Sequence, residues 1–66
     1  MNLYWTSNDN YWHLHKDENR LVGFIERLLP NRFNACDMSN MKWVWKDFDN
    51  LDDAKAWSVV CARMNQ

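Results

Sequence analysis

The sequence predicts a small α+β domain in which an antiparallel sheet of three to four strands packs against two amphipathic helices. Alternating apolar and aromatic residues mark strands near the N-terminus and again at residues 41–46. Apolar residues at helical spacing recur over residues 17–29 and 51–63. The 66 residues allow one domain, residues 1–66, with a thin core, and a single Gly and a single Pro argue against a loop-dominated fold.

Residues 1–15 are typical of a β-hairpin. Residues 3–6 are β-prone, the Ser, Asn and Asp residues at 7–10 favour a turn, and residues 11–15 form the second strand. Alternation gives this second strand one face with Trp12 and Leu14 and another with Tyr11, His13 and His15.

A helix is predicted from Asp17 to Leu29, because Asp17 is a suitable N-cap and Pro30 disfavours helical geometry at the residue before it. The apolar residues recur at i, i+1, i+4, i+7 and i+8, which makes one stripe of Leu21, Val22, Ile25, Leu28 and Leu29. Gly23 lies inside this pattern, where a glycine costs about 1 kcal/mol relative to Ala unless it permits close helix packing. We favour close packing.

Two strands are predicted between the helices. Residues 33–38 form an optional third strand, and residues 41–46 form a clear strand after a turn. Alternation places Met41, Trp43 and Trp45 on the core face of the clear strand and Lys42, Val44 and Lys46 on the other face.

The second helix is predicted to run from Leu51 to about Arg63. Asn50 is its N-cap, and Asp53 completes a shortened capping box. The apolar stripe of this helix comprises Leu51, Ala54, Trp57, Cys61 and Met64. The predicted order of elements is therefore ββα(β)βα.

The net charge of −1 is spread evenly along the chain, which argues against a nucleic-acid binder. Phosphate contacts supply much of the affinity of such proteins and call for a basic surplus. A large acidic surplus, as in a DNA mimic, is missing too. The electrostatics therefore point to a protein partner.

Five tryptophans are the unusual feature of the composition. We expect Trp43, Trp45 and Trp57 to pack in the core, because they match the core faces of their elements. All the tryptophans together with the aliphatic stripes exceed the volume of one thin core, so at least one Trp should remain exposed. The rings expected to accompany it are Tyr4, Tyr11, Phe33 or Phe48. Exposed aromatic clusters on small proteins usually mark interfaces.

The sequence offers little for catalysis or metal binding. His13 and His15 share one strand face, as in some zinc sites, but further ligands could come only from Asp17, Cys36 or Cys61. We therefore interpret them as ordinary strand histidines and expect no metal and no cofactor. A chain this small has little room for the water-excluding pocket that catalysis needs, so we expect no enzyme activity.

Cys36 and Cys61 could form one disulfide, but the chain opens without the basic segment and apolar run of a signal peptide. We therefore expect a cytoplasmic protein in which both thiols are free and buried. The apolar runs are too short to cross a bilayer, so no membrane partner is expected.

The stretch from Trp43 to Trp57 combines a strand with the helix-opening pattern F-x-x-L-x-x-A-K-x-W. In this final third the chain resembles small phage-encoded accessory proteins, including anti-CRISPR and other host-takeover inhibitors. The resemblance implies stoichiometric inhibition in the host cytoplasm, in which a compact domain covers a functional surface of a host enzyme or effector complex. It carries over no functional residue.

We expect a non-catalytic protein that binds and inhibits or modulates a larger cytosolic protein assembly, such as a bacterial CRISPR-Cas system. Aromatic anchors and carboxylates that steer a basic partner make up the predicted partner surface: Tyr4, Tyr11, His13, Asp47, Asp49 and Asp52. The carboxylates also have a structural explanation, since they surround the start of the second helix.

The alternative function is a module for single-stranded nucleic acid. Stacking rings and phosphate contacts would come from Lys42, Trp43, Trp45 and Lys46. Against this function, alternation places the lysines on the face opposite the tryptophans. A homodimer stabilised by the spare aromatic residues is compatible with either function.

Overall fold

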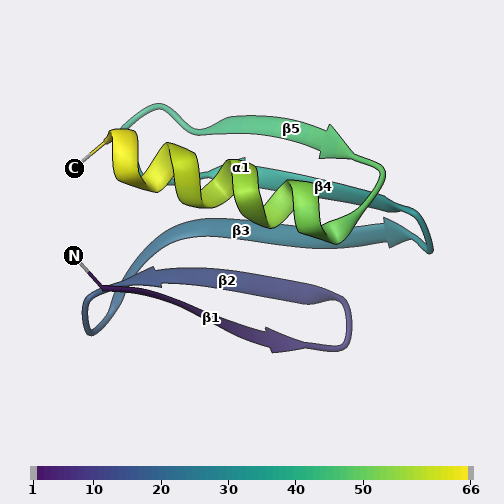
Figure 1. Cartoon of the computed structure of the whole chain (residues 1–66), viewed down its shortest axis with the longest axis horizontal. Helices are drawn as coiled ribbons and strands as arrows, with labels where there is room; N and C mark the ends of the chain where they lie inside the picture. The colour runs from purple at the N-terminus through teal and green to yellow at the C-terminus, as the bar shows by residue number, and fades with distance from the viewer. Residues whose placement is uncertain (1, 66) are drawn as a thin grey trace.

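The computed structural model describes residues 2–65 and shows five strands followed by one helix. The elements are β1 (Leu3–Asn8), β2 (Tyr11–Lys16), β3 (Arg20–Leu29), β4 (Arg32–Asp37), β5 (Val44–Phe48) and α1 (Leu51–Met64). The strands form one antiparallel sheet in the order β1-β2-β3-β4-β5, so each strand pairs with its neighbour in sequence (Figure 1). The α+β class is confirmed, whereas the predicted second helix and the sheet of three to four strands are wrong.

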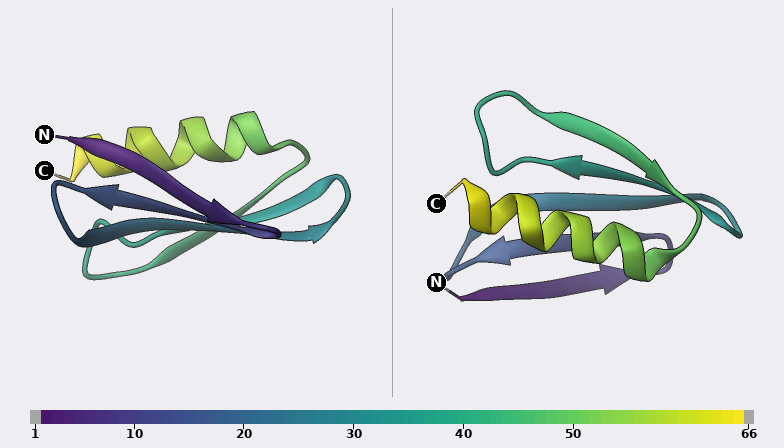
Figure 2. Two further views of the ribbon diagram at one scale, coloured as in Figure 1. Left: turned by 90° about the horizontal axis from the view of Figure 1, so that it is seen from below. Right: turned by 45° about the horizontal axis from the view of Figure 1, so that its top comes forward.

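The molecule has two layers, because α1 lies across one face of the sheet. Seen from below, α1 is on one side of the strands, and no element of residues 2–65 lies on the other side (Figure 2, left). The side of the sheet under α1 is called the helix face below, and the other side is called the open face. None of the helices within residues 2–65 is long and apolar enough to span a bilayer.

The core lies between α1 and the helix face. It consists of two clusters of buried residues. The first comprises Trp12, Ile25, Phe33, Ala35 and Ala54. The second comprises Leu14, Val22 and Ala62. The helix approaches the sheet through the small side chains of Ala54, Ser58 and Ala62, which are spaced four residues apart. The buried Ser58 hydroxyl donates to the Ala54 carbonyl oxygen at 2.9 Å and is therefore satisfied.

Gly23 is in the middle of β3, where the sheet and α1 come close together. A Cβ atom at this position would lie 3.2 Å from Leu14 Cβ and 3.7 Å from Ser58 Cβ. Close packing is thus the role of this glycine, although it serves a strand and not the predicted helix.

Residues 17–29 form a turn and a strand, so the predicted first helix is wrong. β3 is the central strand and hydrogen-bonds to β2 and β4 on its two sides, which outweighs its local helical spacing. The register shift opposite Leu14 and His15 leaves Val22 as an extra residue, so that both Val22 and Ile25 join the core. A strand with this bulge imitates the i, i+3 spacing of a helix.

The two ends of that predicted helix have other roles. Asp17, predicted as its N-cap, lies in the β2–β3 turn with a φ of 58°, a left-handed conformation that Asp tolerates. Leu28 and Leu29 end the apolar pattern but are exposed at the far end of β3.

Trp43 and Trp45 are exposed, so their predicted place in the core is wrong. The strand begins at Val44, later than predicted, and β5 is an edge strand of the sheet in which every residue but Phe48 is exposed. Trp57, in contrast, is half-buried and packs against the core as predicted, with its ring 5.7 Å from that of Phe48. Met64, the last member of the predicted helix stripe, is exposed because α1 packs through Ala54, Ser58 and Ala62 instead.

Other predictions are confirmed. The N-terminal hairpin forms, with Trp12 and Leu14 buried on the helix face, and β4 corresponds to the optional third strand. Asn50 caps α1, because its Oδ1 accepts from the backbone N–H of Asp53 at 2.8 Å and its amide donates to the Asp53 carboxylate at 2.9 Å. Cys36 and Cys61 are both free thiols as predicted, but only Cys36 is buried, and Cys61 is half-buried.

Candidate functional site on the open face

Strand pairing organises the open face into rows that cross the sheet. Directly paired residues of an antiparallel sheet lie on the same face. One row contains a residue from each strand in order, namely Thr6, His13, Phe24, Cys36 and Trp45. We call it the ring row. The adjacent row, called the polar row, contains Asn8, Tyr11, Glu26, Asn34 and Asp47.

Five aromatic rings lie in contact, one after another, on this face, and we call this series the ring chain. Tyr4 stacks on His15 with a centroid distance of 4.9 Å, and His15 is 6.3 Å from His13. His13 is 5.1 Å from Phe24, which stacks on Tyr11 at 5.7 Å. Both ends of the chain, Tyr4 and Tyr11, are exposed. Interfaces favour such rings because they bury a large area with few rotatable bonds.

Hydrogen bonds hold one end of the ring chain in place. The Tyr4 hydroxyl donates to the Glu18 carbonyl oxygen at 2.6 Å, and His15 Nε2 lies 2.8 Å from Thr6 Oγ1. Side chains that are fixed before a partner arrives lose less conformational entropy on binding. The open face is therefore preorganised at this end.

The polar row contains a hydrogen-bond acceptor without a donor. Asn34 Oδ1 is buried and has no partner among the described residues. In the row, Asn34 lies between Glu26 and Asp47, whose carboxylates also accept hydrogen bonds. The flanking carboxylates of Glu26 and Asp47, and not this buried oxygen, are the acceptors of the row that a second molecule can reach.

The structure brings together four of the six residues predicted to bind a partner. Tyr4, Tyr11 and His13 belong to the ring chain, and Asp47 shares the polar row with Tyr11. The other two do not join them. Asp49 accepts a hydrogen bond from the Asn50 amide, and Asp52 lies in the first turn of α1, so both belong to the structural start of the helix.

The sequence did not reveal the central members of the open face. The predicted helix includes Phe24 and Glu26 and so conceals their alternation with Ile25, and Asn34 lies in the optional third strand. The β-prone sequence Val22-Gly-Phe-Ile25 was the signal that could have found them.

The residues of the alternative nucleic-acid site are not brought together. Trp45 is on the open face, whereas Lys46 is on the helix face with its Nζ 5.5 Å from the Phe48 ring. Lys42 and Trp43 precede β5 and are exposed. Within β5, Trp45 and Lys46 therefore lie on opposite faces of the sheet, as the alternation predicts.

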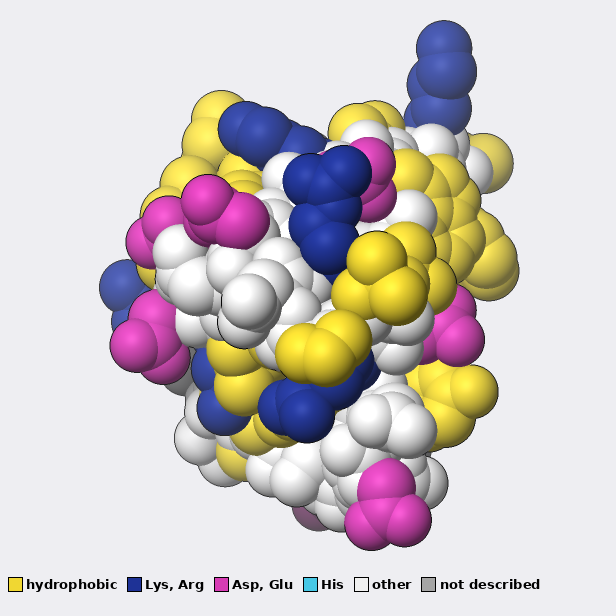
Figure 3. Space-filling view, turned by 90° about the vertical axis from the view of Figure 1, so that its right-hand side faces the viewer, with side chains coloured by type: hydrophobic (Ala, Val, Ile, Leu, Met, Phe, Trp, Pro, Cys, Tyr) yellow, Lys and Arg dark blue, Asp and Glu magenta, His cyan; other side chains and the backbone are white. Residues whose placement is uncertain are grey.

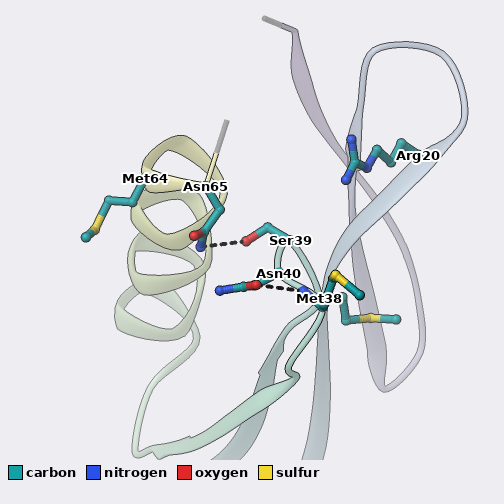
Figure 4. A pocket seen from close by; sticks show the side chains of 7 residues that line it. Arg20, Met38, Ser39, Asn40, Met64 and Asn65 are labelled. Carbon is teal, nitrogen blue, oxygen red and sulfur yellow. Dashed lines mark hydrogen bonds between the residues drawn. The ribbon is translucent and has the colours of Figure 1, made fainter.

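A second candidate site is a depression of about 440 Å³ at the C-terminal end of α1 (Figure 4). Its lining comprises Arg20, Met38, Ser39, Asn40, Met41, Met64 and Asn65. Polar groups beneath it are used internally. Buried Asp37 accepts from the backbone N–H of Ser39 at 2.9 Å, and the Asn65 amide donates to Ser39 Oγ at 3.1 Å and to the Cys61 carbonyl oxygen at 3.0 Å. This network fastens α1 to the sheet.

The two thiols are not activated. Burial raises the pKa of the Cys36 thiol, and the neighbouring Asp37 carboxylate raises it further. The pKa of Cys61 is raised by the same two causes, burial first and the charge of Asp37 second. A raised pKa lowers the fraction of the nucleophilic thiolate, so neither cysteine has the environment of a catalytic one. No group of three or more potential ligands in residues 2–65 is placed to hold a metal ion.

These pKa shifts predict a loss of stability at alkaline pH. The fold retains its thiol protons to a higher pH than the unfolded chain does, so their contribution is fully present below the ordinary pKa near 9.0 and falls as the pH rises above it. Urea denaturation at several pH values gives the free energy of unfolding of the wild type and of a Cys36→Ala, Cys61→Ala variant. As the pH rises, the wild type should lose stability relative to the variant. A constant difference would contradict the prediction.

No protein-family model matches the sequence, and neither a curated protein nor a solved structure matches it.

Proposed function

We propose that this protein is a non-catalytic binding module that docks a larger protein on the open face of its sheet and thereby inhibits or modulates that partner. The observation that carries this proposal is the chain of touching rings Tyr4, His15, His13, Phe24 and Tyr11 on a face that no described element covers. A sheet that presents aromatic rings to solvent gains stability when another surface covers them.

The charges on the open face favour a protein over a nucleic acid. Strand alternation places two carboxylates, Glu26 and Asp47, on this face, and among Lys and Arg in the described strands it places only Arg32 there. A phosphate backbone needs several cations within reach of the stacking rings. Acidic and basic side chains also alternate over the end of the molecule seen in Figure 3, without a basic area.

The polar row supports a partner that presents hydrogen-bond donors. Glu26 and Asp47 offer carboxylate acceptors on either side of Asn34. Arg and Lys side chains of a protein partner supply such donors. The rings would then provide most of the affinity and the polar row the orientation.

The size of the molecule suits this role. A standard interface covers about 800 Å² on each partner, which is about a sixth of the 4539 Å² surface of this chain. A domain that devotes one whole face to a partner can block a functional surface without catalysis. Bacterial defence complexes are the first class of partner to test, because of the resemblance of residues 43–57 to phage-encoded inhibitors.

Matched variants test the proposal. The open-face variant is Tyr4→Ser, Tyr11→Ser, and its control is Val60→Ser, Met64→Ser, which also removes two exposed apolar side chains but from α1. Each protein is titrated by calorimetry against purified CRISPR effector complexes and against a single-stranded oligonucleotide. We expect 1:1 binding to a protein complex by the wild type and the control, and binding weakened about thirtyfold or more in the open-face variant, the loss typical of hot-spot rings.

Two results would contradict the proposal. Equal affinity of the open-face variant and the wild type would remove the open face from the interface. Binding to the oligonucleotide alone, with quenched Trp fluorescence and a steep dependence on salt, would favour the nucleic-acid module instead.

A further inference from the structure

The outer edge of β5 is both unpaired and apolar. β5 hydrogen-bonds to β4 on one side, and no strand of residues 2–65 pairs with its other side. Val44 and Trp45 in this strand, and Met41 and Trp43 in the loop just before it, have exposed fractions from 49% to 101%. An edge strand offers a row of free backbone donors and acceptors, and natural proteins protect such edges unless another chain pairs with them.

The other edge of the sheet differs in composition. The second half of β1 consists of the polar residues Thr6, Ser7 and Asn8. The segment from Met41 to Trp45, in contrast, carries four of the ten exposed large apolar side chains in the described chain. The β5 edge therefore exposes more apolar area beside free backbone groups than the β1 edge, where Tyr4 is the one exposed large apolar side chain of the strand. The helix leaves the start of this edge clear, since the first residues of β5 lie away from α1 and only its end returns to the helix (Figure 2, right).

We propose that β5 pairs antiparallel with β5 of a second copy about a two-fold axis at Trp45, which joins the two sheets into one. A two-fold axis perpendicular to a continuous sheet keeps each face on its own side. Paired residues must then share a face, so the axis passes through a residue of β5. Five centres are available, from Val44 to Phe48.

Four of the five centres are disfavoured by charge or by length. A centre at Lys46 pairs Lys46 with itself, and a centre at Asp47 pairs Asp47 with itself. Centres at the ends of the strand, Val44 and Phe48, leave only one residue of β5 paired with β5 of the second copy. Like charges directly opposite in a sheet are destabilising.

The centre at Trp45 avoids every such conflict. It pairs Trp45 with itself and Val44 with Lys46 of the second copy. The two indole rings then cover each other at the axis, where aromatic cross-strand pairs are favourable. The charges and the length of β5 therefore select one register for self-pairing. The joined sheet has one open face on which both ring chains lie, and this dimer does not depend on the proposed function.

The register predicts which substitutions break the dimer and which restore it. Val44→Lys places two lysines opposite each other at both copies of the Val44–Lys46 pair and should abolish pairing. The double variant Val44→Lys, Lys46→Glu replaces this repulsion with two opposite-charge pairs and should restore it. Val44 is half-exposed, so the single variant should fold, which circular dichroism checks. Val60→Lys on exposed α1 is the matched control.

Light scattering after size exclusion, over a wide range of protein concentration, measures the mass. At high concentration the wild type, the double variant and Val60→Lys should approach twice the 8.1 kDa of one chain, and Val44→Lys should remain at 8.1 kDa. A wild type that stays at 8.1 kDa throughout would overturn the proposal. So would a dimer that survives in Val44→Lys but is lost in Tyr4→Ser, Tyr11→Ser, since self-association would then use the open face.

Discussion

Ile25→Ala is expected to lower the free energy of unfolding by about 3 kcal/mol, within the usual range of 2 to 5 kcal/mol for such a truncation. Ile25 is fully buried between β3 and α1, in the cluster with Trp12 and Phe33, and its removal leaves a cavity. A chain of this length has a total stability of roughly 3 to 10 kcal/mol. The variant should therefore retain roughly 0 to 7 kcal/mol and unfold at a clearly lower urea concentration than the wild type.

Leu28→Ala is the matched control, because it lies in the same strand and belongs to the same apolar pattern of the sequence. Its side chain is 53% exposed, whereas Ile25 is 0% exposed. We expect a change within about 0.5 kcal/mol. A helix over residues 17–29 would bury both residues on one stripe, so equal losses in the two variants would contradict the strand assignment of β3.

Asp37→Ala is expected to lower the free energy of unfolding by about 2 to 3 kcal/mol. The carboxylate of Asp37 is buried and accepts hydrogen bonds from both the backbone N–H and the hydroxyl of Ser39, which in turn binds α1 through Asn65. The truncation leaves these donors without their acceptor and loosens the end of α1. Hydrogen bonds to a charged group are worth more than neutral ones.

Asp37→Asn and Asp47→Ala complete this test. The amide oxygen of Asn can still accept from Ser39, so a smaller loss is expected, and the exposed Asp47 should be nearly neutral. Both Asp37 variants remove the charge that raises the pKa of Cys61. Alkylation of Cys61 should therefore be faster in Asp37→Asn than in the wild type. An unchanged rate together with an unchanged free energy of unfolding would refute this role of Asp37.

The sequence predicted those elements that are set by local signals. The N-terminal hairpin follows from alternation around a polar turn, and the start of α1 follows from the capping pair Asn50 and Asp53. Both features involve residues close together in the chain. Neither feature depends on how the strands pair in the sheet.

The strand β3 could not be predicted in the same way. Its bulge places Val22 and Ile25 three residues apart on one side, which is also the signature of a helix. Pairing with β2 and β4 decides between the two structures, and that pairing depends on distant residues. The exposure of Trp43 and Trp45 has a similar cause, because only the strand order shows that β5 is an uncovered edge.

The candidate site was predictable in its outer members and not in its centre. Tyr4, Tyr11 and His13 followed from the hairpin alone, and exposed aromatic residues followed from the excess of ring volume. Phe24 joins these residues into one chain of contacts, and its position depended on β3. Asp49 and Asp52 looked like part of the surface because the sequence shows an acidic cluster without showing which side of the sheet it occupies.

Aromatic NMR spectra of the protein, free and bound to the protein that it captures, test the central role of the open face most directly. The rings of Tyr4, Tyr11 and His13 should shift on binding, whereas Trp12 and Phe33, buried beneath α1, should keep their free positions. Shifts confined to the exposed side of α1, with the rings of the sheet unchanged, would show that the partner binds elsewhere.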